Sequence, residues 1–314
     1  MPIRTTVIAM CLLMAVPAIA ASRKDHDNCN GNDPDRMITG CTRIISDTSE
    51  EAKVRSTAYV SRAIAWQRKN QRDKALSDYA EAIRLNPDDA LPYNNRAILW
   101  REHGDVDRAI ADFDEAIRRN PQPRSDAAGP GFVNVYTNRG LAWQAKGDYD
   151  RARADYDKGI ELDPNDKIAR DHRGRLLLAL SEYGKAIPDL DMSIQLEPKQ
   201  ARHHYMRGLA RYYQYMHRSE WIKKEDLDGA IADFTQALQL DASDAIARWM
   251  RAMAKETSGN RDGAIADLIE ASRLDPVHQG IRDALKRLKP DYEAPQESLL
   301  SVLKRQEKTQ AGAN

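Results

Sequence analysis

The stretch ALPYNNRAILWREHGDVDRAIADFDEAIRRNPQP, residues 90–123, decides the fold because its pattern recurs along the chain. Two runs with apolar and small residues at helical spacing flank Gly104, and the second run closes in Arg119-Asn120-Pro121. Similar closing triplets end at residues 87, 121, 164, 198, 242 and 276, so their spacings are 34, 43, 34, 44 and 34 residues. A fixed period of this kind predicts an array of small units, each packed on its neighbours.

Within each unit the same offsets carry the same kind of side chain. When units are numbered so that the triplet ends at position 32, and the insertion of the fifth unit is left out of the count, position 8 is always Ala or Gly, position 20 is always Ala and position 24 is always large. Small residues allow two antiparallel helices to approach closely, and the large residue fills the space beyond them. In chain order these positions hold Ala63, Ala97, Gly140, Gly174, Gly208 and Ala252; Ala75, Ala109, Ala152, Ala186, Ala230 and Ala264; and Tyr79, Phe113, Tyr156, Leu190, Phe234 and Leu268.

On these residues the chain resembles the tetratricopeptide repeat (TPR) family over about residues 56–276. The resemblance implies an all-α fold, a right-handed superhelical solenoid of helix–turn–helix repeats whose first helices line a concave groove. It also implies binding of a protein or peptide partner rather than catalysis. The six repeats are expected at residues 56–89, 90–123, 133–166, 167–200, 201–244 (with an insertion) and 245–278.

The pattern predicts two helices in each repeat. The first helices are expected at residues 56–69, 90–103, 133–146, 167–180, 201–217 and 245–258, and the second at 72–85, 106–119, 149–162, 182–196, 226–240 and 261–274. Three features depart from the family pattern: Trp at position 11 of the first three units (Trp66, Trp100, Trp143), an interruption at 215–225, and Pro188 in a second helix. We expect Pro188 to kink that helix or to push its start later.

Both ends of the array need a cap, because a terminal repeat cannot bury its outer face on a neighbour. Residues 277–290 continue as an amphipathic helix, and residues 21–55 contain a lone helix from Asp35 to Ile45. Cys29 and Cys41 are the two cysteines of this N-terminal cap, and an oxidising compartment favours a disulfide between them. Two free buried thiols are the alternative, whereas two sulfurs without a matching His pair do not make a zinc site.

The first 20 residues have the order of a secretory signal. Arg4 precedes the apolar run Val7–Ala20, which ends in Ala18-Ile19-Ala20, so cleavage is expected after Ala20. A membrane anchor is the alternative, but the run is shorter than the roughly 20 residues that span a bilayer. Cys11 lies inside the apolar run, which argues against a lipoprotein. We therefore expect secretion across the inner membrane, with a bacterial periplasm as the destination and no integral membrane segment in the mature chain.

Composition and motifs argue against several classes of function. The 48 Lys and Arg residues balance 48 Asp and Glu residues, so bulk charge gives no attraction to nucleic acid. Nucleotide-binding glycine loops, H-E-x-x-H and G-x-S-x-G are all missing from the sequence, and the adjacent His203 and His204 would point about 100° apart on a helix. We therefore predict no catalytic residues, no cofactor and no metal, and the sequence does not indicate an oligomeric state.

Every repeat carries Arg at position 7 and Asp at position 23. Packing of one second helix on the next first helix predicts a structural ladder between neighbours, in which each carboxylate accepts a bidentate Arg fork and sets the register. Pairing within a repeat, and a charged track for a substrate, are the alternatives. The predicted pairs are Asp78–Arg96, Asp112–Arg139, Asp155–Arg173, Asp189–Arg207 and Asp233–Arg251.

The family resemblance places six positions of each first helix on the concave side. In the early and middle repeats the candidates carry amide or guanidinium groups that bind a peptide backbone: Asn94, Asn95, Arg101, Asn134, Asn138 and Gln144. In the fifth and sixth repeats they are aromatic or flexible apolar anchors, with core between repeats as the alternative. These are Tyr205, Met206, Leu209, Tyr212, Tyr213, Trp249, Met250 and Met253.

The family's carboxylate clamp for chaperone tails is not expected here. Its five positions hold Val60, Ile64, Asn95, Asn134 and Asn138, and only one of them matches. The tail 291–314 contains a short amphipathic stretch, and we consider both a frayed terminus and helical docking of 296–306. The sequence thus predicts a non-catalytic periplasmic scaffold that binds a polypeptide. The alternatives are an envelope chaperone for unfolded clients and an enzyme or enzyme subunit with a site that no motif reveals.

Overall fold

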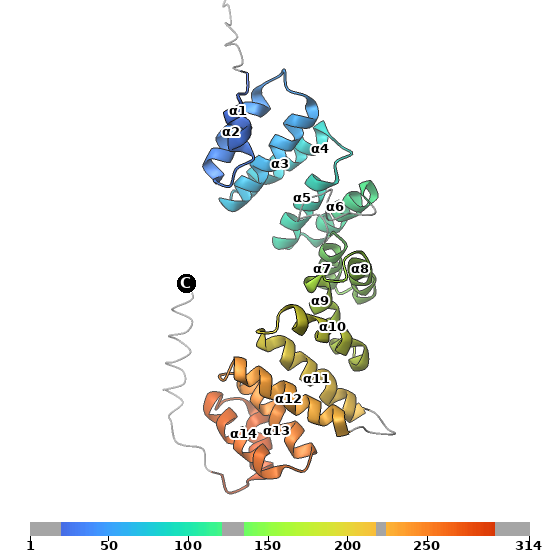
Figure 1. Cartoon of the computed structure of the whole chain (residues 1–314), viewed down its shortest axis with the longest axis vertical. Coiled ribbons are helices and arrows are strands. Elements are labelled where there is room, and N and C mark those ends of the chain that lie inside the picture. Colours follow the sequence, from blue (N-terminus) through green and yellow to red (C-terminus); the bar gives the residue numbers. More distant parts are fainter. Residues whose placement is uncertain (1–19, 121–134, 218–223, 293–314) are drawn as a thin grey trace, which may run out of the picture. The chain divides into compact units, whose positions relative to one another are not determined.

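The computed structural model describes residues 20–120, 135–217 and 224–292 (Figure 1). Within these ranges it contains fifteen helices and no strand, which confirms the predicted all-α fold. In chain order the helices are α1 (Arg23–Cys29), α2 (Pro34–Ser46), α3 (Ala52–Arg68), α4 (Arg72–Leu85), α5 (Ala90–Glu102), α6 (Val106–Arg119), α7 (Val135–Lys146), α8 (Tyr149–Leu162), α9 (Lys167–Ala179), α10 (Tyr183–Leu196), α11 (Ala201–His217), α12 (Lys224–Leu240), α13 (Ala245–Thr257), α14 (Arg261–Leu274) and α15 (Gln279–Leu288).

Most helix boundaries lie within two residues of those that the repeat pattern predicts. Two differences occur near the N-terminus, where α3 begins four residues earlier than expected and α1 was not predicted at all. Seven residues are too few for the hydrophobic period to stand out, so α1 shows in the sequence only through its cap. Ser22 accepts the Asp25 backbone N–H, and the Asp25 side chain accepts the Ser22 N–H.

Two kinds of local signal divide the chain into hairpins. Asp residues cap many of the helices, as Asp166 does for α9 by accepting the N–H groups of Ile168 and Ala169. The turn inside a hairpin needs a left-handed residue, which is Gly104 at φ 81° after α5 and Ser181 at φ 60° after α9.

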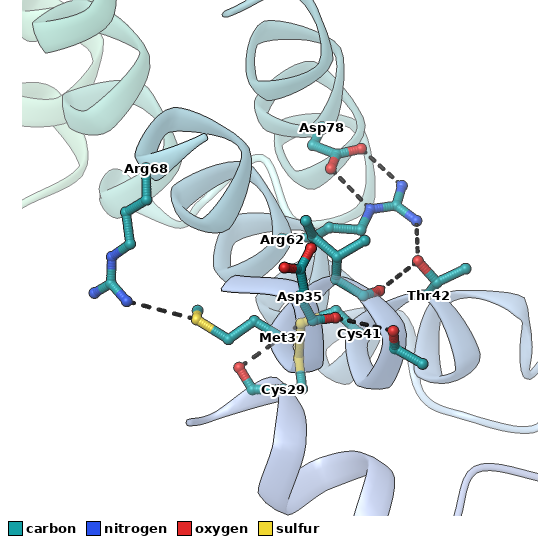
Figure 2. The surroundings of a disulfide bond; sticks show 10 residues. Cys29, Asp35, Met37, Cys41, Thr42, Arg62, Arg68 and Asp78 are labelled. Carbon is teal, nitrogen blue, oxygen red and sulfur yellow. Dashed lines mark hydrogen bonds and ion pairs between the residues drawn. A yellow bond between two sulfur atoms is a disulfide. The ribbon is translucent and has the colours of Figure 1, made fainter. Parts of the chain in front are cut away.

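The chain divides into two compact units, residues 1–147 and 148–314. In the first, α1 and α2 pack on the α3–α4 hairpin, and α5 and α6 form the next hairpin. The small residues at positions 8 and 20 and the large residue at position 24 are buried as predicted, with Ala63, Ala75 and Tyr79 fully inaccessible. Cys29 and Cys41 form the predicted disulfide, and both residues lie in a small core with Ile44 and Ala58 (Figure 2).

The second unit is built in the same way from α9–α10, α11–α12 and α13–α14. Its last hairpin is covered by α15, whose Ile281, Leu285 and Leu288 are buried against Leu268. The insertion in the fifth repeat lengthens α11 and α12 to 17 residues each. Pro188 lies inside α10, which begins at Tyr183, so the expected later start is wrong. The helix begins at position 17 of its repeat, as α4, α6, α8 and α14 do.

Of the expected segments at the ends of the chain, residues 1–19 and 293–314 lie outside the described residues. No helix in the described ranges combines the length and apolar character needed to cross a membrane.

Candidate functional site

In five of the repeats, the recurring Arg and Asp residues pair inside their own hairpin, and among the described residues none of these five Arg side chains bonds to the position-23 Asp of the preceding repeat. Arg173 donates from Nε and Nη2 to the two carboxylate oxygens of Asp189, both at 2.7 Å. The predicted ladder between neighbours is therefore wrong, and the alternative of pairing within a repeat is what the structure shows. The short turn of a hairpin holds positions 7 and 23 at one level. The five pairs described are Arg62–Asp78, Arg96–Asp112, Arg173–Asp189, Arg207–Asp233 and Arg251–Asp267.

Four of these Arg residues (Arg62, Arg173, Arg207 and Arg251) also reach the preceding element through their remaining nitrogen, Nη1. Arg173 donates to Asp157 at 2.6 Å and Arg207 donates to Asp191 at 2.7 Å, in each case two residues beyond the Asp at position 23 of the previous repeat. Arg62 makes the equivalent contact with Thr42 of the N-terminal cap, at 2.9 Å (Figure 2). One guanidinium thus joins both helices of its own hairpin to the neighbour. The spacing D-x-D, as in Asp189-Leu190-Asp191, is the sequence signal for this contact.

The candidate groove residues of the first unit differ in accessibility. Asn94 is fully buried and donates from Nδ2 to Asn95 Oδ1 at 3.2 Å, so its assignment to an accessible groove is wrong. Asn95, Arg101, Asn138 and Gln144 are partly exposed, whereas Asn134 lies outside the described residues. Asn94 therefore belongs to the packed interior of the first unit.

Nearby, α4, α6, α7 and the turn between α5 and α6 border an open polar pocket of about 420 Å³. Arg72, His103, Asp105, Asp107 and Lys146 contribute to its wall, and Lys146 binds Asp107 at 2.6 Å. Because that pair cancels one positive and one negative charge of the wall, and the remaining charged residues are of both signs, the pocket has no marked preference for an anion or a cation.

The apolar candidates of the second unit are divided between core and surface. Met250 is only 6% exposed and packs with Leu227 and Phe234, so it is a core residue and its assignment to the groove is wrong. Three further candidates, Tyr205, Tyr212 and Trp249, pack against the same core but remain partly exposed. Met206 and Met253 are also partly exposed. Met206 packs against the core that contains Leu190, and Met253 packs against the core that contains Leu268.

Aromatic rings beyond these candidates extend the apolar surface of α11. Tyr183 of α10 stacks on Tyr213 with ring centroids 5.5 Å apart, and it stacks on His217 at the same distance. Tyr212 meets Tyr213 edge to face at 5.4 Å. Sequence reasoning missed Tyr183 and His217, because the first lies at the start of a second helix and the second belongs to the extension of α11. Burial raises the pKa of Tyr205 to about 12, so its hydroxyl stays protonated at neutral pH.

A charged centre on α9 and α11 was also missed. Asp171 is 6% exposed, and its Oδ2 lies 2.9 Å from Arg202 Nη2 and 3.7 Å from Arg175 Nη1. His203 Nε2 lies 3.5 Å from Asp171 Oδ1. Burial works against ionisation of Asp171, but the His203 contact and the two guanidinium charges outweigh it and lower the pKa of that carboxyl. One buried carboxylate therefore positions two guanidinium groups that remain partly exposed.

These groups belong to consecutive first helices, since α9 contacts α11 and α11 contacts α13. Arg202, Tyr205, Tyr212 and Tyr213 recur at helical spacing along α11, and Trp249 and Met253 lie one turn apart on α13. We call this set, with Arg175 and Met206, the first-helix surface of the second unit. It places cationic groups beside aromatic and apolar side chains. Across the described residues, no three His, Cys, Asp or Glu side chains form a group able to hold a metal ion.

Comparison with known proteins identifies the repeats. Two family models, both described as tetratricopeptide repeat, match residues 133–166 and residues 61–122 and 222–278. A search of curated protein sequences gave no significant match.

Solved structures show the same fold at low sequence identity. YrrB, a TPR protein with an unusual peptide-binding site, is 22% identical and covers 66% of this chain and 97% of its own, with a TM-score of 0.58. The pilF protein of Pseudomonas aeruginosa is 14% identical, covers 73% and 95%, and has a TM-score of 0.55. A TPR protein from Parabacteroides merdae is 17% identical, covers 84% and 96%, and has a TM-score of 0.51. The solved structures share the fold, and the family models identify this chain as a tetratricopeptide repeat protein, built from repeats that generally bind protein partners.

Proposed function

We propose that this protein is a non-catalytic scaffold that binds a segment of a partner polypeptide on the first-helix surface of its second unit. The observation that carries the proposal is the juxtaposition of the Asp171–Arg202–Arg175 centre with partly exposed aromatic rings on the same helices. A polypeptide with an acidic group next to an apolar or aromatic side chain matches both features. The peptide site named for YrrB supports the general mode of binding, and it is a property of that protein.

The energetics favour binding over a merely structural role for these side chains. Asp171 holds Arg202 and Arg175 in place, and the exposed fraction of the side chain is 54% for Arg202 and 38% for Arg175. A guanidinium that is already oriented loses less rotamer freedom when it binds a carboxylate. The neighbouring tyrosines offer rigid contact area with few rotatable bonds. The guanidinium groups and aromatic rings of this surface are therefore largely preorganised for binding a partner.

We further propose that the protein acts in the bacterial periplasm. The support is the signal-like sequence of residues 1–20, together with a buried disulfide between Cys29 and Cys41. A disulfide of this kind persists in an oxidising compartment and is rare in the cytosol.

Site-specific photo-crosslinking in cells that make the protein tests this function. A photoreactive amino acid at Tyr212 is expected to trap a defined polypeptide, because Tyr212 lies on the first-helix surface. The matched control carries the same group at Gln239, an exposed position on the second helix α12. Adducts of equal yield and composition at both positions would contradict a specific site.

A second pair of variants tests the charged centre. Arg202→Ala is expected to reduce the Tyr212 adduct about tenfold or more, as expected for the loss of a charge-assisted contact. Arg273→Ala removes an exposed arginine of α14 that pairs with Glu270, and it should leave the adduct unchanged. Equal adduct yields in the two variants would remove Arg202 from the binding surface.

A further inference from the structure

Near the start of the described residues, the backbone of Ala21 is bonded to a buried carboxylate, that of Asp47. The backbone N–H of Ala21 donates to Asp47 Oδ2 at 2.7 Å, and Ala21 packs against the small core that contains the disulfide. Asp47 is 5% exposed. Its other oxygen, Oδ1, accepts the backbone N–H of Ser49 at 2.9 Å and the Ser49 hydroxyl at 2.5 Å. Ala20, by contrast, is exposed.

This carboxylate is ionised at neutral pH but has no cationic side chain bonded to it in the described part of the chain. Hydrogen bonds from Ser49 and from the Ala21 backbone lower the pKa of Asp47. The ring of His26 is bonded to Glu50, with Nε2 2.9 Å from Oε1, and no hydrogen bond joins His26 to Asp47 in the described residues. Neutral donors alone compensate a buried charge incompletely, so the environment of Asp47 favours a cation at the position of Ala21 N.

We propose that the chain is cleaved between Ala20 and Ala21, and that the α-ammonium group released on Ala21 binds Asp47. The cleavage is a hydrolysis by a processing peptidase of the secretory route. Water adds across the peptide bond, Ala20 leaves with the leader as a carboxylate, and Ala21 keeps the nitrogen, which is protonated at neutral pH. The proposal rests on secretion, but it does not depend on partner binding.

Two independent observations select the same bond. The order Ala18-Ile19-Ala20 is a cleavage signal read from the sequence alone. The hydrogen bond to Asp47 comes from the tertiary structure, and it involves the nitrogen that this cleavage converts to an ammonium group. Cleavage at a neighbouring bond would either remove that nitrogen or leave it as a neutral amide.

The start of α1 explains why an anion is needed here. The new ammonium group would lie directly before Ser22, the N-cap of α1, where the helix dipole disfavours positive charge. Asp47 offsets that charge, and Asp25 in the first turn adds a second carboxylate nearby. Through the Cys29–Cys41 disulfide and its core, the ammonium–carboxylate pair stabilises the cap on the first repeat.

The first experiment identifies the mature N-terminus. The full-length gene, with its first 20 codons, is expressed in a secreting bacterial host, and the folded protein is characterised by intact mass and N-terminal sequencing. We expect Ala21 as the first residue. A retained leader or a start at any other residue overturns the proposal.

The second experiment measures the ion pair through the rate at which a small thiol reduces Cys29–Cys41 under native conditions. Both cysteines are buried, so reduction requires the cap to open. Asp47→Asn in the chain that starts at Ala21 should accelerate reduction about tenfold, the size expected for a charge-assisted bond. A chain that retains Ala20 should already be faster, and Asp47→Asn should accelerate it much less.

The control is Asp27→Asn, an exposed carboxylate of α1, which should leave the rate unchanged. Equal acceleration by Asp47→Asn in both chains, or none in the chain that starts at Ala21, overturns the ion pair. If Asp47→Asn prevents folding of the cap, the comparison of the two N-termini still decides, because it leaves Asp47 intact. Loss of partner binding would not alter either readout.

Discussion

At the residue scale, the carboxylates at position 23 are the most constrained polar groups of the repeats. Asp189 is 1% exposed and accepts hydrogen bonds from Arg173 and from Arg170, the latter at 3.1 Å. Such a pair adds little stability compared with an apolar alternative, but removal of one partner leaves buried charge uncompensated. The Arg–Asp pairs therefore specify how the two helices of a hairpin meet.

Replacing Asp189 by Ala should lower the free energy of unfolding by about 3–5 kcal/mol, because two largely buried guanidinium groups lose their acceptor. Asp191→Ala removes the contact of Arg207 with the preceding repeat, and the Asp191 side chain is 49% exposed. Its cost should stay below about 1 kcal/mol. Urea unfolding followed by circular dichroism compares the two variants, and equal shifts of the midpoint would contradict this ranking.

Ser181 illustrates a second constraint at single residues, the left-handed turn inside a hairpin. Its φ of 60° is close to the 86° of Gly259, the equivalent residue of the last repeat. Ser181→Gly should stabilise the protein by about 0.5 kcal/mol, since relief of backbone strain exceeds the entropy cost of Gly. Gly259→Ala should destabilise it by about 1 kcal/mol, although a Cβ there meets no atom within 4 Å. Opposite shifts in thermal midpoint are expected, and shifts of the same sign would refute the strain argument.

At the element scale, α10 tolerates a residue that should interrupt it. Pro188 cannot donate a hydrogen bond to the carbonyl four residues earlier, yet the helix runs from Tyr183 to Leu196. The small core of Leu177, Ala186, Leu190 and Ala210 accounts for this, because tertiary packing overrides local propensity.

Pro188→Ala should restore the missing hydrogen bond and raise the free energy of unfolding by up to about 3 kcal/mol. Pro188 is exposed, so the substitution removes no core contact. Amide hydrogen exchange in α10 should slow in the variant, with exchange in α4 of the first unit as the internal control. Faster exchange in α10 would show that Pro188 stabilises the helix by another route.

At the scale of the whole molecule, stability rests on many ionised carboxylates. Burial alone would raise the pKa of Asp267, but its bonds to Arg251 and Lys255 and their charges lower the pKa below the ordinary 3.8. The pKa of Asp171 is lowered for a similar balance of reasons. A carboxyl with a lowered folded-state pKa stabilises the fold above its unfolded pKa and loses that contribution as the pH falls through the folded value.

We therefore expect the urea midpoint to change little between pH 7 and pH 5 on account of these groups. It should fall steeply below about pH 4, where the unfolded chain takes up protons that the folded chain does not bind. Asp267→Asn should have a lower midpoint at pH 7 and a shallower acid dependence. A midpoint that rises on acidification would mean that groups of opposite sign dominate.

Much of the architecture could be predicted from the sequence, because the residues that pack together in one repeat recur at the same positions in the others. The recurring small residues, such as Ala75 and Ala109, and the recurring large ones, such as Tyr79, identify a hairpin core from periodicity alone. The disulfide and the left-handed turns are equally local signals.

The contacts of the candidate site were less predictable. Position 7 could pair with position 23 of its own repeat or of the preceding one, and both choices satisfy the sequence. Only the packed structure shows that Arg207 donates from Nε to Asp233 of its own repeat and from Nη1 to Asp191 of the preceding one. Sequence reasoning also placed Met250 and Tyr212 in the same groove, although Met250 is a core residue and Tyr212 is partly exposed.

What the sequence by itself determined is therefore the set of hairpins, their boundaries and the family, since these follow from short-range periodicity. The tertiary structure alone decided which side chains of the first helices are buried between repeats and which remain available. It also placed Ala21 on Asp47 and Arg202 on Asp171. The physical reason is that these pairs lie about 30 residues apart in the chain and come together only when helices pack, so no local pattern encodes them.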